Sequence, residues 1–257
     1  MIFFVICVVA FLASALTFFS GFGLGTLLLP AFALFYPIEQ AVAFTAVVHF
    51  LNGIFKLGLV GRHASRHILI AFGVPAVVAS LVGAWVLLQL VHVEPVATYF
   101  LGGREMVVMP VKLVIGFLLL IFALVEFLPW FQKIAFPTKY FPVGGLLSGF
   151  FGGLSGMQGA LRSAFLARAN ITKEAFVATG VVIAFLIDIP RLAIYSRMFL
   201  DGGIQVDYGV LGAALIAALS GAYLGNRYLK KITMGVIQKI VAAMLFAVAL
   251  GLISGFL

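Results

Sequence analysis

The chain has 257 residues, of which 64% are hydrophobic and 9% charged, and its formal net charge is +8. This composition excludes a soluble globular fold, because apolar runs of about 20 residues recur along the whole length and each can cross a bilayer as a helix. The single cysteine, Cys7, excludes an intramolecular disulfide, and we find no Cys/His metal spacing, P-loop or nucleophile elbow, so no metal or other cofactor is expected.

The apolar runs predict an all-α polytopic membrane protein, since they are apolar all round rather than alternating as barrel strands would be. The first region, residues 2–36, is too long for one crossing and is interrupted by Ser20-Gly-Phe-Gly-Leu-Gly25 and Pro30. It has no basic residue before it and no small-residue cleavage site, so we expect a retained segment rather than a signal peptide. Continuous spans are then predicted at 40–60, 68–91 and 107–128.

A second broken region, residues 141–168, opens the other half of the chain. Its interruptions are Gly149, Gly152, Gly153, Gly156 and Gly159. Glycines at this density weaken a helix and permit a tight reversal. Three more continuous spans are predicted at 174–195, 207–225 and 234–256.

The positions of the basic residues indicate whether each broken region crosses the membrane once or returns to its starting side. If both return, one face holds nine basic residues: Arg62, Arg66, Lys133, Lys139, Arg168, Lys173, Arg227, Lys230 and Lys231. The other face holds two, Arg104 and Arg197, with the acids Glu39, Glu94, Glu105, Asp201 and Asp207. Single crossings would instead split the same residues five against six. The positive-inside rule therefore favours two hairpins, and it assigns the basic excess to cytoplasmic loops rather than to a nucleic-acid partner.

The two halves repeat each other in sequence. Residues 39–57 align without a gap to residues 174–192, with eight of the 19 positions identical, and Lys56 aligns with Arg191. With a hairpin and three crossings per half, the repeats are inverted and both termini lie outside a bacterial-type cytoplasmic (inner) membrane. We expect residues 1–128 to form the first repeat, 129–141 a cytoplasmic linker and 142–257 the second repeat of one membrane domain.

Several polar residues fall inside the predicted spans, where a charge is costly and marks a pathway unless it is paired or reaches the interface. Thr45, His49, Asn52 and Lys56 recur at helical spacing and form one polar face, predicted to lie against the break at Ser20–Gly25. Arg162 follows the second glycine break by a turn, where helix N–H groups and a guanidinium together suit an oxyanion. Substrates of inverted-repeat transporters bind near the repeat interface. The predicted substrate-binding residues are Ser20, Gly21, Gly23, Gly25, His49, Asn52, Lys56, Ser155, Gly156, Gln158, Gly159, Arg162 and Arg191.

Each of these assignments has a structural alternative. Lys56, Arg191, Lys112 and Lys239 lie near span ends and could snorkel to the interface, and Arg162 could do the same toward Arg168. Asp188 precedes Arg191 by three residues, and it aligns with Gly53 in the first half. It either pairs with that arginine or carries a coupling proton, with His49 as the alternative proton carrier and Glu126 as a weaker one.

At this point the chain resembles the TauE/SafE family of sulfite and organosulfonate exporters, over essentially its full length. The resemblance rests on Ser20-Gly-Phe-Gly-Leu-Gly-Thr-Leu-Leu-Leu-Pro30 with the helix that follows it, and on the second copy at Leu147–Phe165. Phe165 stands where the repeat partner of Pro30 is expected, and Met157-Gln158 interrupts the second glycine run. The resemblance implies export of a sulfur-containing anion such as sulfite, sulfoacetate or sulfolactate, driven by protons.

Three functions remain in view from the sequence. The leading one is a secondary transporter that moves a small anion through the bilayer by alternating access. The second is an anion channel, or a transporter of another small carboxylate or oxyanion. The third is an intramembrane enzyme, which would need paired acids or a His/Asp cluster at mid-membrane, whereas Asp188 and His49 lie in different halves. A homodimer is left open.

Overall fold

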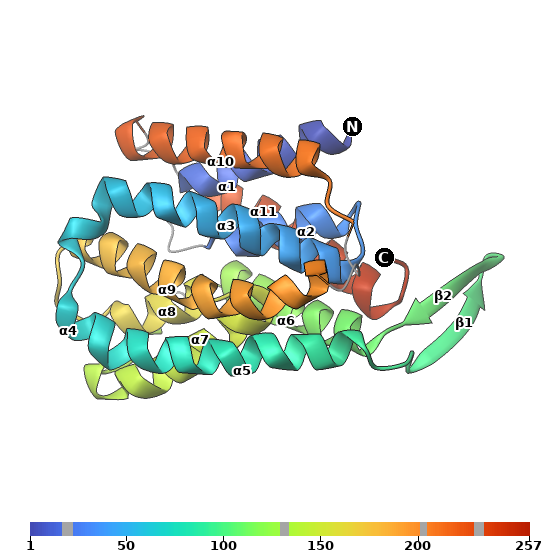
Figure 1. Cartoon of the computed structure of the whole chain (residues 1–257), viewed down its shortest axis with the longest axis horizontal. Helices are drawn as coiled ribbons and strands as arrows, with labels where there is room; N and C mark the ends of the chain where they lie inside the picture. The colour runs from blue at the N-terminus through green and yellow to red at the C-terminus, as the bar shows by residue number, and fades with distance from the viewer. Residues whose placement is uncertain (17–22, 129–133, 201–204, 229–233) are drawn as a thin grey trace.

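The computed structural model describes residues 1–16, 23–128, 134–200, 205–228 and 234–257 and is built almost wholly of helices (Figure 1). The first half contains α1 (Ile2–Leu16), α2 (Leu24–Ala33), α3 (Ile38–Val60), η1 (Gly61–His63), α4 (Arg66–Ile68), η2 (Leu69–Gly73), α5 (Val74–Val91) and α6 (Pro110–Phe127). The second half contains η4 (Thr138–Tyr140), α7 (Phe141–Ser155), α8 (Gly159–Leu166), α9 (Lys173–Leu200), α10 (Tyr208–Tyr228) and α11 (Met234–Ile253).

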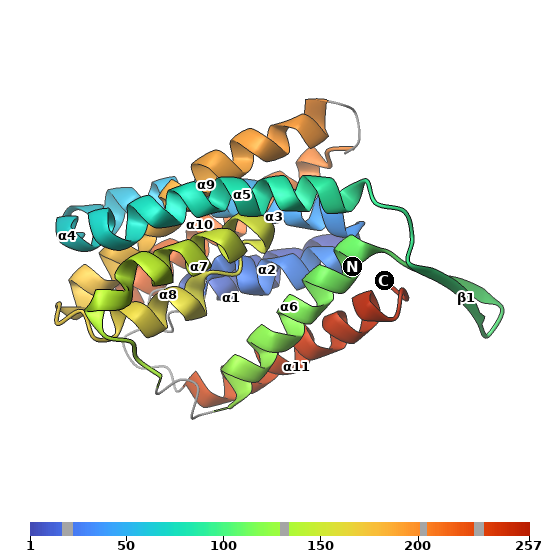
Figure 2. The ribbon, with the colours of Figure 1, turned by 90° about the horizontal axis from the view of Figure 1, so that it is seen from below.

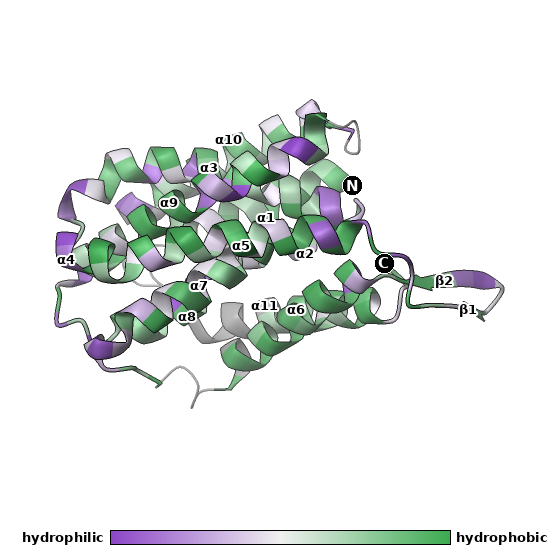
Figure 3. Cartoon of the chain, turned by 60° about the horizontal axis from the view of Figure 1, so that its bottom comes forward, coloured by the Kyte–Doolittle hydropathy of each residue, from purple (hydrophilic) through white to green (hydrophobic). Residues whose placement is uncertain are grey.

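The helices have the length and the surface of membrane spans. Within the described ranges, four are long and apolar enough to cross a bilayer: Ile38–His63, Arg66–Val91, Lys173–Leu200 and Tyr208–Arg227. Along α5, the apolar side chains of Val74, Val78, Val82 and Trp85 are each more than half exposed, as suits a face turned to lipid. Hydrophilic residues gather at the turn around α4 and along β2 (Arg104–Val108) (Figure 3). The prediction of an all-α polytopic membrane protein is confirmed.

One element was not predicted from the sequence. Between α5 and α6, β1 (Ala97–Leu101) and β2 form an antiparallel two-stranded hairpin that projects from the bundle (Figures 1 and 2). Its two-residue turn is Gly102-Gly103, with φ of 60° and 80°, a conformation that favours glycine at both positions. The apolar run from 107 was assigned to a span, but its first residues belong to β2 and the helix begins at Pro110.

The second broken region folds into a helical hairpin. α7 runs parallel to α5 at close range, since a Cβ at Gly149 or Gly153 would lie 2.0 or 2.1 Å from the carbonyl oxygen of Ala76 or Ser80. Small residues permit such close approach of helices in a bilayer. α7 ends at Gly156, whose φ of 81° is left-handed. α8 then turns back along α7, so that the Phe165 ring lies against Gly144.

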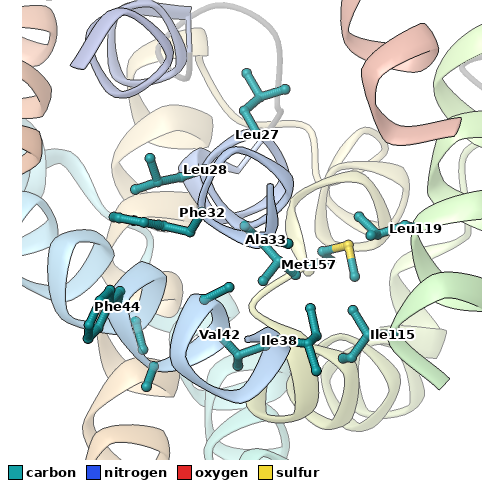
Figure 4. Packing of buried hydrophobic residues seen from close by; sticks show 14 of the residues in the cluster. Leu27, Leu28, Phe32, Ala33, Ile38, Val42, Phe44, Ile115, Leu119 and Met157 are labelled. Atoms are coloured by element: carbon teal, nitrogen blue, oxygen red, sulfur yellow. The ribbon is translucent and has the colours of Figure 1, made fainter. Parts of the chain in front are cut away.

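The first broken region also gives two helices. α1 packs along α10, where a Cβ at Gly221 would lie 2.1 Å from the carbonyl oxygen of Phe11. α2 follows after the glycine break, and all ten of its residues are buried. It lies at the centre of the main hydrophobic core, with Leu28 and Phe32 beside α3 and Met157 of the α7–α8 turn between α2 and α6 (Figure 4).

The two ends of the bundle differ in what they carry. Both chain termini and the β-hairpin lie at one end, and the α3–α4 and α8–α9 turns lie at the other (Figures 1 and 2). Of the nine basic residues predicted on one face, six are described, and all belong to segments at the second end: Arg62, Arg66, Lys139, Arg168, Lys173 and Arg227. Lys133, Asp201, Lys230 and Lys231 fall outside the described residues.

Candidate functional site

A cavity of about 1190 Å³ lies between α3, α8 and α9. This volume exceeds the roughly 300–1,000 Å³ usual for small-molecule pockets, so the cavity can hold a small anion together with water. Its lining includes His63, Asn170, Lys173, Glu174 and Asn226, which belong to the end of the bundle that carries the α3–α4 and α8–α9 turns. The cavity therefore has its mouth at the basic end of the molecule.

The inner wall of the cavity collects residues from both halves of the chain. Among the predicted site residues it contains Gly23, His49, Asn52, Lys56 and Arg162. Three members of the polar face on α3 thus reach the cavity. The fourth, Thr45, is fully buried, is not part of the lining, and its hydroxyl has no hydrogen-bond partner among the described residues.

Arg162 comes from the first turns of α8 and lines the cavity opposite α3. Its Nε lies so close to α9 that a Cβ at Gly180 would be 3.2 Å from it. Within the described residues, no hydrogen bond or ion pair joins its guanidinium to a protein group. A planar cation that faces a cavity and keeps its N–H donors free of hydrogen bonds to described residues is suited to bind an anion.

Lys56 brings a second cation to the same cavity from the opposite wall. Its side chain is 6% exposed, and its Nζ donates to the carbonyl oxygen of Ser14 at 3.4 Å. The Ser14 hydroxyl in turn donates to Oδ1 of Asn52 at 3.2 Å. These bonds hold the end of α1 against α3, a role for Ser14 that no sequence signal indicated.

The tips of the two broken regions meet beside Arg162. A Cβ on Gly25 would lie 2.8 Å from the carbonyl oxygen of Gly156, and one on Gly23 would lie 3.9 Å from the amide nitrogen of Gly159. Gly23 and Gln158 are the N-caps of α2 and α8, and neither end has a side-chain cap. Both helix N-termini, with their free N–H groups and partial positive charge, are thereby brought to one place.

The remaining described residues that were predicted at these tips lie outside the cavity lining. Ser155 is buried, and its hydroxyl donates to the carbonyl oxygen of Phe151 at 2.9 Å. Gln158 is also buried, and neither polar atom of its side chain has a hydrogen-bond partner among the described residues. Ser20 and Gly21 are not among the described residues, and the side chains of Glu126 and Lys239 are not described either.

Asp188 joins the two halves through a buried cluster next to the cavity. One of its carboxylate oxygens pairs with Nδ1 of His49, and the other accepts from Nη1 of Arg191 at 3.4 Å. Arg191 is fully buried, donates through Nη2 to the carbonyl oxygen of Val42 at 3.3 Å, and stacks over the ring of Tyr195. Asp188 and Arg191 do not line the cavity, whereas His49 does. The imidazole is thus the member of the cluster in reach of cavity water.

The sequence named His49 and Asp188 separately but did not pair them. The pairing follows from an antiparallel crossing of α3 and α9, centred where the aligned residues Phe50 and Phe185 stack with ring centroids 5.1 Å apart. Around that centre, a residue just before Phe50 meets one just after Phe185, as His49 meets Asp188. The two identical phenylalanines are the signal that could have found this pair.

At the end of the bundle away from the cavity mouth, α2 and α3 are tied to α10. The hydroxyl of Tyr36, in the α2–α3 turn, donates to Oδ2 of Asp207 at 2.9 Å. Two hydrogen bonds to the carboxylate hold the pKa of Asp207 below its usual range. The bond from the Val210 amide has the larger effect, and the bond from Tyr36 adds to it. The Tyr36 ring also packs edge-on against Phe32 and Phe44. These contacts hold the described parts of α2, α3 and α10 together at this end.

Comparison with known proteins gives one match, to a family model. A family model described as sulfite exporter TauE/SafE matches residues 6–252. The match includes both glycine breaks and every residue that lines the cavity. No curated protein and no solved structure matches the chain.

Proposed function

The chain belongs to the TauE/SafE family of sulfite exporters, and from this membership and the cavity we propose that it exports a small sulfur-containing anion, such as sulfite or sulfoacetate, by alternating access. The observation that carries the proposal is Arg162, whose guanidinium makes no hydrogen bond or ion pair among the described residues and lies at the inner wall of a cavity that opens at one end. The anion would lie against its guanidinium, between the N-termini of α2 and α8.

The basic end of the bundle is the cytoplasmic end in this proposal. The six described basic residues of that end stand against Arg104 and Arg197 at the other, in agreement with the positive-inside rule. The cavity would then be open to the cytoplasm, which is where an exporter loads. The protein would sit in a bacterial-type cytoplasmic membrane with both termini outside.

Inverted repeats account for the two hairpins. In this proposal the α1–α2 pair enters the membrane from the outside and the α7–α8 pair from the inside, so that their tips meet near the middle. The boundary between the repeats would fall in the linker at 129–141. Rocking of one repeat against the other would break the Tyr36–Asp207 contact at the outer end and close the inner mouth.

Proton coupling would run through the His49–Asp188 pair. His49 lines the cavity while Asp188 is buried and shared with Arg191. When an anion binds in the cavity, the His49 imidazole would take up a proton from cavity water, and the carboxylate of Asp188 would stabilise the resulting imidazolium; release of the anion would return the proton to water.

An anion channel is the second candidate function. A channel needs a pore that is continuous across the bilayer. Among the described residues, the lining of this cavity extends from its mouth as far as Gly23 and His49. Toward the opposite end, the Tyr36–Asp207 hydrogen bond and the aromatic rings around it join the described helices to one another. The geometry therefore favours a transporter, as does membership of a transporter family.

The proposed function is tested by efflux from proteoliposomes that are loaded with labelled sulfite and carry an imposed pH gradient. We expect efflux that saturates with internal sulfite concentration and that depends on the gradient. Efflux that rises linearly with concentration and ignores the gradient would favour the channel. Protein-free liposomes provide the background.

Membrane orientation is tested by cysteine labelling. Cys7 is first replaced by Ser, and single cysteines are then introduced at Arg66, Lys139 and Arg104. In right-side-out vesicles, a membrane-impermeant thiol reagent is expected to label the site at Arg104 and to leave Arg66 and Lys139 unlabelled until the vesicles are opened. Labelling of Arg66 or Lys139 from outside would reverse the assignment.

A further inference from the structure

The last turn of α7 carries carbonyl groups that the helix itself cannot satisfy. The final carbonyls of a helix lack an N–H partner four residues on, and in a membrane interior each needs another donor. The amide of Gly156 donates to the Gly152 carbonyl at 2.8 Å, and the left-handed φ of Gly156 then ends the helix. The carbonyls of Gly153 and Leu154 have no donor within α7, because their partners four residues on lie beyond its end.

Tyr195 of α9 supplies the missing donor. Its hydroxyl shares one proton between the carbonyl oxygen of Gly153 at 2.6 Å and that of Leu154 at 3.1 Å. The side chain is fully buried, and a hydrogen bond is stronger there than in water because the local dielectric is low. A residue of the next long helix thus fixes the end of α7.

The ring of Tyr195 supports a second contact with the same turn. The Arg191 guanidinium lies over the ring, 5.2 Å from its centroid. It also lies directly against Gly156, since a Cβ there would be 2.7 Å from Nη1 and 3.0 Å from Nη2. The carbonyl oxygen of Gly156 in turn meets Gly25, at the start of α2. The α7–α8 turn is therefore in contact with α9 and with the first hairpin at once.

This turn sets where the N-terminus of α8 lies. Gln158, the N-cap of α8, follows Gly156 by two residues, and its carbonyl oxygen accepts from the amide of Arg162 at 3.0 Å. A shift of the turn therefore moves both the free N–H groups of α8 and Arg162. A site that populates other conformations binds its ligand with an affinity lowered by the fraction of competent molecules.

We propose that Tyr195 is a positioning residue of the anion site, which acts through the α7–α8 turn and not by contact with the anion. Tyr195 is not part of the described cavity lining. The proposal rests on the proposed function, since it concerns the same site. Without the hydroxyl, the last turn of α7 would open locally, and the N-terminus of α8 would be aligned with that of α2 in only a fraction of the molecules.

The test is Tyr195→Phe, which removes the hydroxyl and keeps the ring beneath Arg191. Hydrogen exchange of the full-length protein in nanodiscs, followed by mass spectrometry, is expected to be faster in peptides covering 153–162 and unchanged in α1 and α10. Calorimetric titration should show sulfite binding weakened about threefold to tenfold, which is what the loss of one ordinary hydrogen bond amounts to. Saturating sulfite should return the exchange at 153–162 toward the wild-type rate, because the bound anion favours the closed turn.

Two comparisons make the outcome specific. Tyr99→Phe also removes a hydroxyl that donates to a carbonyl at 2.6 Å, that of Ser254 beyond the end of α11, and it should change neither readout. Replacement of Tyr195 by 4-aminophenylalanine restores an N–H donor at the same place and should recover the wild-type sulfite affinity, whereas a role in overall packing would not depend on the donor.

Two results would overturn the positioning role: wild-type exchange at 153–162 in Tyr195→Phe, or wild-type sulfite affinity in that variant. Failure of the wild-type protein to bind sulfite would instead overturn the proposed function. The exchange comparison between wild type and Tyr195→Phe would still decide whether this hydroxyl holds the turn.

Discussion

Replacing Arg162 with Ala is expected to weaken the binding of sulfite or sulfoacetate tenfold to a hundredfold. The Arg162 guanidinium lines the inner cavity and makes no hydrogen bond or ion pair with a described residue. The bound anion would therefore be its main hydrogen-bond partner. A hydrogen bond to a charged group contributes about 1.5–3 kcal/mol, and that free energy corresponds to the stated loss of affinity. The dissociation constant is measured by calorimetry on protein in nanodiscs.

The matched control for this variant is Arg168→Ala. Arg168 lies just beyond α8, is exposed and does not line the cavity, so its removal should leave the affinity unchanged. Thermal unfolding of both variants shows whether the fold is kept. Wild-type affinity in a folded Arg162→Ala protein would mean that this arginine only reaches toward the interface.

Loss of the dependence of transport on the pH gradient is expected in both Asp188→Asn and His49→Gln. In the proposed coupling, His49 exchanges protons with cavity water and Asp188 fixes its charge, so neither residue can act without the other. Efflux from proteoliposomes, with and without an imposed gradient, measures the effect. Substrate binding should be largely retained, because Arg162 and Lys56 are untouched.

The two variants differ in stability, and this difference separates coupling from packing. Asp188→Asn leaves the fully buried Arg191 without its charged partner, which should cost about 3–5 kcal/mol and lower the melting temperature. His49→Gln keeps the Asp188–Arg191 pair. His63→Gln, at the cavity mouth, serves as the control for removal of a lining histidine. Gradient-dependent transport in both Asp188→Asn and His49→Gln would remove the pair from the mechanism.

The helical architecture was predictable because it follows from local properties of the chain. Apolar runs located four spans to within five residues at each end: Ile38–His63, Arg66–Val91, Lys173–Leu200 and Tyr208–Arg227. The β-hairpin is the exception: it was missed although Gly102-Gly103 is a strong turn signal, because the last residues of β2, 106–108, are apolar and run directly into the next span. Hydropathy alone does not distinguish a short apolar strand from the first turns of a membrane helix.

The candidate site was predictable in part. Helical spacing placed His49, Asn52 and Lys56 on one face, and these residues line one cavity with Arg162, which was singled out for its place after a glycine break. The His49–Asp188 pair and the anchoring of Lys56 by Ser14 depend on how α3 crosses α9 and α1. Such contacts between distant helices are set by packing, which one sequence does not display.

In the proposed function, a small sulfur-containing anion binds between the tips of the two hairpins, against Arg162. An electron cryo-microscopy structure of the protein in nanodiscs with sulfite, compared with one without it, tests this most directly. We expect added density in contact with the Arg162 guanidinium, near Gly23 and the N-terminus of α8. Density bound elsewhere, with the Arg162 side chain unchanged and unoccupied, would contradict it.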